Sequence, residues 1–168
     1  RAHEYHTLLD AAALLAGRPE IVFLITGAGA KVDALRRDAA ARRLSNLRFQ
    51  PFQPPERLPD SMAAADVHWL SLLPALEGLI VPSKFYGILA AERPAIFIGD
   101  ADGEIARDIR AWDCGFSVAV GDGAALARLI DDAATDRECV AGMGVEAHGL
   151  WRAQFTLDRM LAEHEALY

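Results

Sequence analysis

The stretch Ile21-Val22-Phe23-Leu24-Ile25, followed after Thr26 by Gly27-Ala28-Gly29-Ala30, decides the fold class of this 168-residue chain. A continuous run of β-branched and aromatic residues is typical of a strand buried on both faces of a parallel sheet. The glycine turn leads into residues 32–44, whose apolar spacing predicts an amphipathic helix. A strand, a glycine turn and a helix in this order indicate an α/β domain.

The same alternation continues along the chain. Further strands are predicted at residues 47–50, 66–70, 95–98 and 115–120, and helices at residues 3–16, 56–64, 83–92, 104–112, 124–134, 137–146 and 150–167. This order predicts a Rossmann-like, doubly wound parallel sheet of about six strands with helices on both faces. Residues 1–168 are interpreted as one domain, and we expect ligands beyond the carboxyl ends of the strands.

Composition excludes several classes of protein. The formal net charge of -7 argues against nucleic acid as the main partner, because phosphate binding needs a basic face. No apolar run reaches the roughly 18 residues that span a bilayer, and no signal peptide is visible. The absence of a starting Met suggests that the chain begins within a longer protein. Cys114 and Cys139 lack CxxC spacing, so we expect buried free thiols in a reducing cytoplasm.

Several common catalytic sites are also absent from the sequence. The five histidines show no HxxxH or HExxH spacing, so neither a metal nor another cofactor is expected. No GxxxxGK[ST] phosphate loop and no GxSxG nucleophile turn occur. Asp66 lacks the upstream acidic pair of a phosphorylated receiver domain. A glycosidase would need two carboxylates close together, and the sequence gives no basis for pairing Glu77 with Glu104.

Two loops near the start of the chain could hold a nucleotide. Small residues at Gly27 and Gly29, with Lys31 behind them, would let backbone N–H groups approach a phosphate. The pattern is not a full GxGxxG, so a plain tight turn is the alternative. Gln50 and Phe52 follow the second strand and offer an amide edge and a flat ring to a nucleobase. Phe49 is interpreted as a core residue, and for Phe52 both roles stay open.

The segment Glu77-Gly78-Leu79-Ile80-Val81-Pro82-Ser83-Lys84 offers a third loop. Ser83 is predicted to cap the following helix, which places Lys84 in its first turn. A cation is disfavoured at a helix N-terminus unless an anion faces it, so Lys84 indicates a diphosphate site. The alternative is a surface lysine whose apolar stem packs on the protein. A fourth loop, residues 99–104, ends at Glu104, which is interpreted as a cap at the start of a helix.

Residues 81–96, VPSKFYGILAAERPAI, are similar to the P-S-K-x-x-E-x-x-A-x-G-x-P-V-I run of family 4 (group 1) glycosyltransferases of the colanic-acid and polysaccharide type. The resemblance covers residues 3–155 and extends to Gly27-Ala28-Gly29, residues 47–52, Ala64-Ala65-Asp66-Val67, residues 102–107 and Cys114-Gly115. It implies the C-terminal domain of a two-domain GT-B enzyme.

The resemblance implies that this domain binds a nucleotide-diphospho-sugar such as a UDP- or GDP-sugar, without a metal. The sugar would pass with retention to an acceptor glycan or lipid-linked glycan in polysaccharide or glycoconjugate synthesis. The N-terminal acceptor domain would lie outside this chain, so the fragment alone would be inactive. Any contact with the inner face of the membrane would be made by that N-terminal domain. The donor-binding residues expected here are Gly27, Gly29, Lys31, Gln50, Phe52, Glu77, Leu79, Ile80, Val81, Pro82, Ser83 and Lys84.

The chain departs from the family pattern at two positions. Gly87 stands where a glutamate often grips the nucleotide ribose, and Glu92 stands where a glycine usually ends the helix. Glu77 is out of register with the first glutamate of that motif. Two alternatives therefore stay open: half of a sugar-nucleotide epimerase, and a non-catalytic domain that binds a nucleotide or a protein. Titration with UDP, GDP and their sugars would separate binding from non-binding domains.

Overall fold

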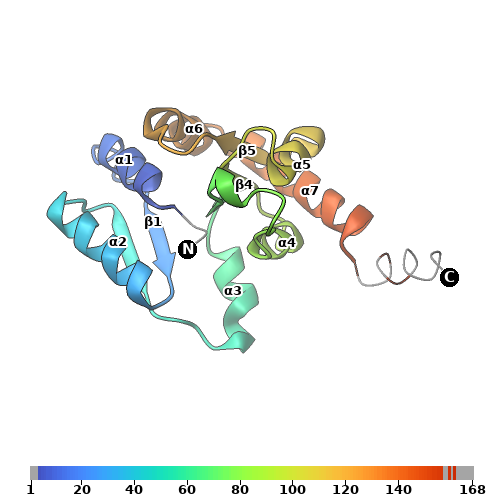
Figure 1. The fold of residues 1–168 in the computed structure, drawn as a ribbon, viewed down its shortest axis with the longest axis horizontal. Coiled ribbons are helices and arrows are strands. Elements are labelled where there is room, and N and C mark those ends of the chain that lie inside the picture. Colours follow the sequence, from blue (N-terminus) through green and yellow to red (C-terminus); the bar gives the residue numbers. More distant parts are fainter. Residues whose placement is uncertain (1–3, 157–158, 160, 162–168) are drawn as a thin grey trace.

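The computed structural model describes residues 4–156, 159 and 161, and these form an α/β arrangement (Figure 1). The described strands are β1 (Phe23–Thr26), β2 (Leu47–Gln50), β3 (His68–Ser71), β4 (Ala95–Ile98) and β5 (Gly115–Val118). The helices are α1 (His6–Leu14), α2 (Ala30–Ala41), α3 (Leu58–Ala63), α4 (Lys84–Ala90), α5 (Glu104–Trp112), α6 (Gly123–Thr135) and α7 (Arg137–Gln154), with short 3-10 turns η1 (Pro55–Arg57) and η2 (Pro74–Leu76). The described strands number five, against about six predicted.

All the described strand pairs are parallel, but they form two separate groups. β1 pairs with β2, with Phe23 opposite Leu47, and β3 pairs with β4, which pairs with β5. Within the described residues no pairing joins β1 to β3. The expected single sheet is therefore present as two parts, which contribute to one shared hydrophobic core.

The two layers of helices follow from alternation along β4. Ile96 and Ile98 point into a core formed with β1, β2, α1, α2 and α6, while Ala95 and Phe97 point into a core formed with α4, α5 and α7. All residues of β4 are buried, as expected for a strand covered on both faces. The prediction of helices on both faces is confirmed.

β1 departs from the burial that its sequence predicts. Phe23 and Ile25 are buried, but Leu24 is 43% exposed, and Val22 just before the strand is 51% exposed. The apolar run therefore has one covered face and one open face. Within the described residues β1 also has a neighbouring strand on only one side.

Two further predictions need correction. The helices expected at residues 137–146 and 150–167 begin as a single helix, α7, which continues through Gly144 and Gly149 to Gln154. Most of residues 157–167 lie outside the described residues. Cys114 is buried and free as expected, but Cys139 lies in the first turn of α7 and is exposed.

Candidate donor-binding site

The glycine loop after β1 has the backbone shape that its sequence suggests. Gly27 and Gly29 adopt φ values of 142° and 109°, a region that side-chain-bearing residues rarely occupy. α2 begins at Ala30, directly after Gly29, and the exposed Lys31 lies in its first turn. The loop therefore lies at the carboxyl end of β1 and at the positive end of a helix, where an anion is favoured.

Phe52 lies beside this loop rather than in the core. A Cβ atom placed on Gly27 would come within 3.7 Å of the Phe52 ring, whose residue is 72% exposed. The carbonyl oxygen of Gln50 accepts a hydrogen bond from the Gly27 amide at 3.0 Å, which ties the two loops together. Phe49 instead packs against the core under the guanidinium group of Arg36, 4.8 Å from the ring centroid. The core interpretation of Phe49 is thus confirmed, and Phe52 is a surface residue.

The loop between β3 and α4 exposes apolar side chains. Leu79 is 73% exposed, Ile80 44% and Val81 39%, whereas Pro82 is buried. The loop turns at Gly78, whose φ of 75° is left-handed. Leaving three large apolar side chains in water costs free energy unless a ligand or a neighbouring domain covers them.

Ser83 does not cap α4 with its side chain, contrary to the prediction. Its backbone is already helical, with φ of -57° and ψ of -21°, and its side chain makes no capping hydrogen bond. The Phe85 amide donates instead to the carbonyl oxygen of Pro82 at 2.9 Å. Because a capping side chain needs an extended backbone, the helical conformation of Ser83 rules out that geometry.

Lys84 is directed toward β3. Its Nζ donates a hydrogen bond to the carbonyl oxygen of Trp69 at 3.1 Å and lies 5.8 Å from the centroid of the Trp69 ring. The side chain keeps an exposed surface, but desolvation by the surrounding protein atoms lowers the pKa of its amine. A partly desolvated amine binds an anion more strongly than one in open water.

Glu77 makes a contact that sequence reasoning missed. Its Oε1 accepts a hydrogen bond from the Glu104 amide at 2.8 Å, so Glu77 caps α5 from another loop and Glu104 does not provide the cap. A Cβ atom on Gly103 would lie 2.7 Å from the Glu77 carboxyl carbon, which explains why a glycine precedes Glu104. Oε2 of Glu77 is buried and has no hydrogen-bond partner within the described residues. Only the small residue at position 103 hinted at this contact.

The predicted residues form two groups on the two parts of the sheet. Gly27, Gly29, Lys31, Gln50 and Phe52 lie at the carboxyl ends of β1 and β2. The remaining ones, Glu77, Leu79, Ile80, Val81, Pro82, Ser83 and Lys84, lie between β3 and the start of α4. Phe52 and Lys84 both line a pocket of about 1200 Å³ between the two parts, and Gln50 lines a smaller one.

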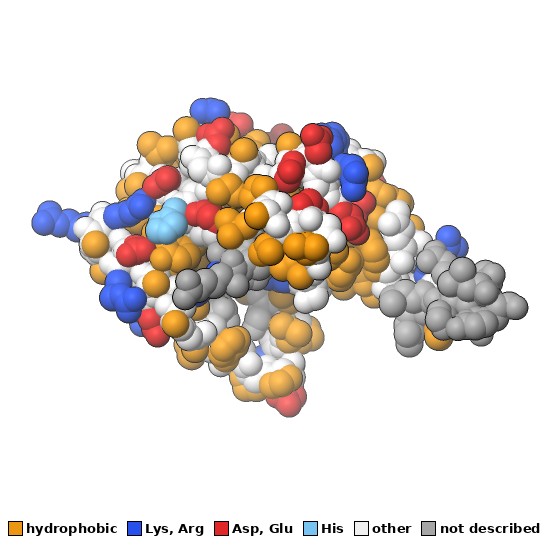
Figure 2. Space-filling view, viewed as in Figure 1, with side chains coloured by type: hydrophobic (Ala, Val, Ile, Leu, Met, Phe, Trp, Pro, Cys, Tyr) orange, Lys and Arg blue, Asp and Glu red, His pale blue; other side chains and the backbone are white. Residues whose placement is uncertain are grey.

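Neither a metal site nor a transmembrane helix is present in the described part of the chain. No group of three or more His, Cys, Asp or Glu side chains there could hold a metal ion. None of the helices in residues 4–156 is long and apolar enough to cross a membrane. The face shown in Figure 2 mixes acidic and basic side chains, with apolar ones gathered near its middle. Charges of both signs are thus interspersed on this face.

Comparison with known proteins places this arrangement in a family. The sequence pattern described as "Glycosyl transferases group 1" matches residues 1–148. The chain belongs to the group 1 glycosyltransferases. A relative, the probable glycosyltransferase WbjE of Pseudomonas aeruginosa, is 34% identical over 110 residues, which is 66% of this chain and 28% of WbjE.

Solved structures show the same fold in other glycosyltransferases. A mutant of S. aureus TarM in complex with fondaparinux, α-GlcNAc-glycerol and UDP matches with a TM-score of 0.81 and 14% identity over 99% of this chain and 33% of TarM. Anabaena Alr3699/HepE in complex with UDP-glucose matches with a TM-score of 0.75 and 20% identity over 97% of this chain and 45% of HepE. This group 1 chain thus has the Rossmann-like fold of a GT-B domain and spans less than half of these proteins.

Proposed function

We propose that this chain is the donor-binding, C-terminal domain of a two-domain glycosyltransferase. In this role it binds a nucleotide-diphospho-sugar, and the sugar is transferred with retention to an acceptor glycan held mainly by an N-terminal domain. The match of residues 1–148 to the group 1 glycosyltransferases carries the proposal. The complexes of TarM with UDP and of HepE with UDP-glucose support a nucleotide sugar as the donor.

The loop geometry supports a division of labour between the two groups of residues. The exposed ring of Phe52 beside Gly27 offers a stacking surface for a base, and the amides at the start of α2 face a phosphate. Lys84 supplies a positive charge on the other side. As the bond between sugar and diphosphate breaks, negative charge grows on the leaving diphosphate, and a fixed cation with backbone N–H donors stabilises that charge.

The exposed apolar loop supports a neighbouring domain or ligand. Leu79, Ile80 and Val81 are exposed at the carboxyl end of the strands, where GT-B enzymes place the cleft between their two domains. Closure of such a cleft covers these side chains and excludes water from the transferred sugar. The proposal includes an N-terminal half that binds the acceptor and a cytoplasmic location. It also assigns any contact with a membrane surface to that N-terminal half.

Calorimetric titration of the intact polypeptide with UDP, GDP and their sugars tests the proposal. Lys84→Ala should weaken binding of the preferred nucleotide by about tenfold or more, because a charge-assisted contact to phosphate is lost. Arg128→Ala, which removes an exposed cation from α6, is the matched control and should change the affinity less than about twofold. Unchanged affinity in Lys84→Ala would remove Lys84 from the site, and no binding by any nucleotide would refute the proposed function.

A further inference from the structure

The loop between β3 and α4 is joined to a distant helix by one side chain. Oε1 of Glu77 accepts a hydrogen bond from the Glu104 amide at 2.8 Å, although the two residues are 27 positions apart in the chain. Glu104 is the first residue of α5, so the carboxylate lies at the positive end of a nine-residue helix. A hydrogen bond from a backbone N–H group to a carboxylate is of the strong, charge-assisted kind. The contact therefore fixes Glu77 against the start of α5.

Gly103 shows that this contact is built into the packing. Gly103 is buried, and a Cβ atom built on it would lie 2.7 Å from the carboxyl carbon of Glu77 and 2.8 Å from each carboxylate oxygen. Its φ of -66° and ψ of 162° suit any residue, so the backbone conformation does not require glycine. The space that the carboxylate occupies requires it. A residue before a helix usually supplies the cap from its own side chain, and here Glu77 supplies it from another loop.

The residues that follow Glu77 have little else to hold them. The chain turns at Gly78, whose φ of 75° is left-handed. Leu79 is 73% exposed, Ile80 44% and Val81 39%, so apolar packing does not anchor this part of the loop. The amides of Leu79 and Ile80 both donate to the carbonyl oxygen of Leu76, at 3.1 and 3.3 Å. A segment with few buried contacts opens locally at a low cost in free energy unless its ends are fixed.

The far end of the loop is fixed by the core. Pro82 is buried, and its carbonyl oxygen accepts a hydrogen bond from the amide of Phe85, which is 1% exposed. Lys84 is tied to β3 by the hydrogen bond of its Nζ. Residues 78–81 therefore lie between two fixed ends, Glu77 at α5 and Pro82 at α4. Release of the Glu77 contact would free residues 78–81 and leave Lys84 in place.

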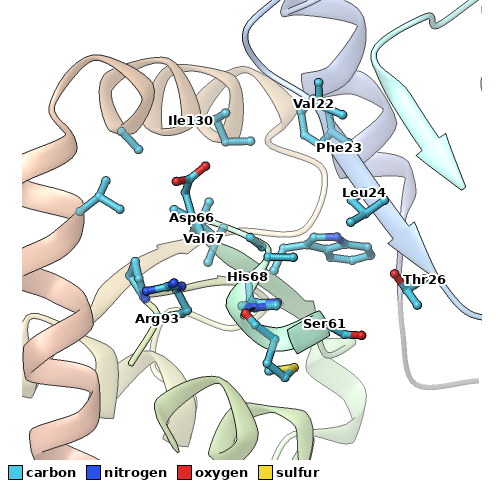
Figure 3. A pocket seen from close by; sticks show the side chains of 18 of the residues that line it. Val22, Phe23, Leu24, Thr26, Ser61, Asp66, Val67, His68, Arg93 and Ile130 are labelled. Atoms are coloured by element: carbon cyan, nitrogen blue, oxygen red, sulfur yellow. Dashed lines mark hydrogen bonds between the residues drawn. The ribbon is translucent and has the colours of Figure 1, made fainter. Parts of the chain in front are cut away.

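Lys84 and residues 78–81 also differ in their relation to the large pocket between the two parts of the sheet. Figure 3 shows this pocket, with Thr26 and His68 among the side chains around it, and Lys84 lines it as well. Of the described residues that line the pocket, none belongs to the segment 77–81. The Glu77 contact therefore acts on a segment that the pocket walls do not support.

The second oxygen of Glu77 indicates that the carboxylate is kept for more than stability. Oε2 is buried and has no hydrogen-bond partner within the described residues. A buried acceptor without a partner lowers stability, because it has lost its hydrogen bonds to water. Local costs of this kind are expected at functional segments, where the surrounding structure maintains them.

We propose that Glu77 is a positioning residue of the donor site. Its carboxylate fixes residues 78–81 against the start of α5, so that the loop has its binding conformation before a donor arrives. A preorganised loop loses less conformational freedom on binding than a mobile one, and the donor is bound more tightly. The inference rests on the proposed function, because this loop belongs to the residues assigned there to the nucleotide-diphospho-sugar.

Native-state proteolysis with thermolysin tests the state of the loop without any ligand. Thermolysin cleaves before large apolar residues, and the exposed run Leu79-Ile80-Val81 offers three such bonds in the intact polypeptide. In Glu77→Ala, cleavage of this run should be at least about tenfold faster, because local opening no longer breaks the contact with α5. Fragment masses identify the cleaved bonds. Glu138→Ala removes an exposed acid from the first turn of α7 and should change the rate by less than about twofold.

Gly103→Ala breaks the same contact without removing the carboxylate. The added Cβ atom displaces the flexible end of Glu77, while alanine suits the backbone conformation of position 103. This variant should raise the cleavage rate at least about fivefold, and the double variant should be within about twofold of Glu77→Ala, since both changes remove one interaction. Gly142→Ala, at a glycine whose Cβ position meets nothing within 4 Å, is the matched control. Unchanged cleavage in either single variant, or effects that multiply in the double variant, would overturn the proposal.

Nucleotide affinity separates positioning from a purely structural role. In calorimetry on variants that circular dichroism shows to be folded, Glu77→Ala should bind the preferred nucleotide about five- to tenfold more weakly. Glu77→Gln keeps the side-chain length and an oxygen acceptor for the Glu104 amide, so its affinity should stay within about threefold of the unsubstituted protein. A faster-cleaved loop with unchanged affinity would overturn the positioning role.

Two other outcomes are also decisive. A Glu77→Gln variant with a protected loop but the weak affinity of Glu77→Ala would indicate a direct contact between the carboxylate and the donor, and would overturn the proposal. Failure of the unsubstituted protein to bind any nucleotide would refute the proposed function and the donor role of Glu77 with it. The thermolysin result involves no nucleotide, so a failure of the loop contact is distinguished from a failure of the proposed function.

Discussion

Two glycines of α7 should respond to the same substitution with opposite signs. Gly142 is exposed, and a Cβ atom built on it meets nothing within 4 Å. Gly144 is buried, and a Cβ atom there would lie 2.6 Å from the carbonyl oxygen of Glu92, with Pro94 Cδ at 3.7 Å. The second glycine therefore lets α7 approach the segment that leads into β4.

The magnitudes follow from these surroundings. Alanine is favoured over glycine within a helix by about 1 kcal/mol, so Gly142→Ala should raise the free energy of unfolding by about 0.5–1 kcal/mol. The same gain applies at Gly144, but a carbon atom 2.6 Å from a backbone oxygen forces the helix outward. Overpacking of this kind costs about 1–3 kcal/mol. Gly144→Ala should therefore be destabilising on balance, by up to about 2 kcal/mol.

Urea denaturation of both variants, followed by circular dichroism, measures the two free energies. At an m-value of about 1–3 kcal/mol/M, a change of about 1 kcal/mol shifts the urea midpoint by about 0.3–1 M, which is readily resolved. Stabilisation by both substitutions would refute the close approach of α7 to Glu92. Destabilisation by both would refute the open surroundings of Gly142.

Three further outcomes follow from the structure. Burial raises the pKa of the Cys114 thiol to about 12, so a thiol reagent at pH 8 should modify only the exposed Cys139 in native protein. Both cysteines should react after unfolding in urea. Fast reaction of two thiols in native protein would contradict this. Desolvation lowers the pKa of His68 below 6.5. The unfolded state therefore binds a proton more readily than the folded state, and the free energy of unfolding should fall as the pH drops below about 6.5. His68→Phe should flatten this pH dependence in acid titrations followed by fluorescence. Phe52→Ala removes an exposed ring that packs little, so calorimetry should show nucleotide affinity reduced by about tenfold with an unchanged unfolding midpoint; a lower midpoint would instead indicate a core role.

Much of the fold could be predicted because the local signals were strong. β2, β4 and α5 begin and end at the predicted residues, since each is bounded by residues such as Pro94 or Gly103 that mark an element's end. The break predicted between residues 146 and 150 was wrong, because α7 is continuous from Arg137 to Gln154. A Cβ atom on Gly144 would lie 2.6 Å from the carbonyl oxygen of Glu92, and one on Gly149 would lie 3.7 Å from the Trp112 ring, so tertiary packing accounts for these glycines within the helix.

The site was harder to predict than the fold. The sequence placed the loops at the carboxyl ends of the strands, but not the directions of their side chains. Ser83 has a capping residue type without a capping conformation, and the cap of α5 comes from Glu77, 27 residues earlier in the chain. Such contacts between loops depend on tertiary packing, which a local pattern does not encode. The assignment of the twelve residues to donor binding stays a prediction.

The hydrogen bonds that hold the first described residues have a consequence for biosynthesis. The Gly121 amide donates to the Thr7 hydroxyl across 114 residues, and Ser71 bonds to Glu4 across 67. At a ribosomal rate of about 5–20 residues per second, Thr7 would leave the peptidyl-transferase centre about 6–23 s before Gly121 is made. During that interval α1 cannot reach its final partners. The apolar side of α1 therefore stays without its packing partner α6 until residues 123–135 have been made.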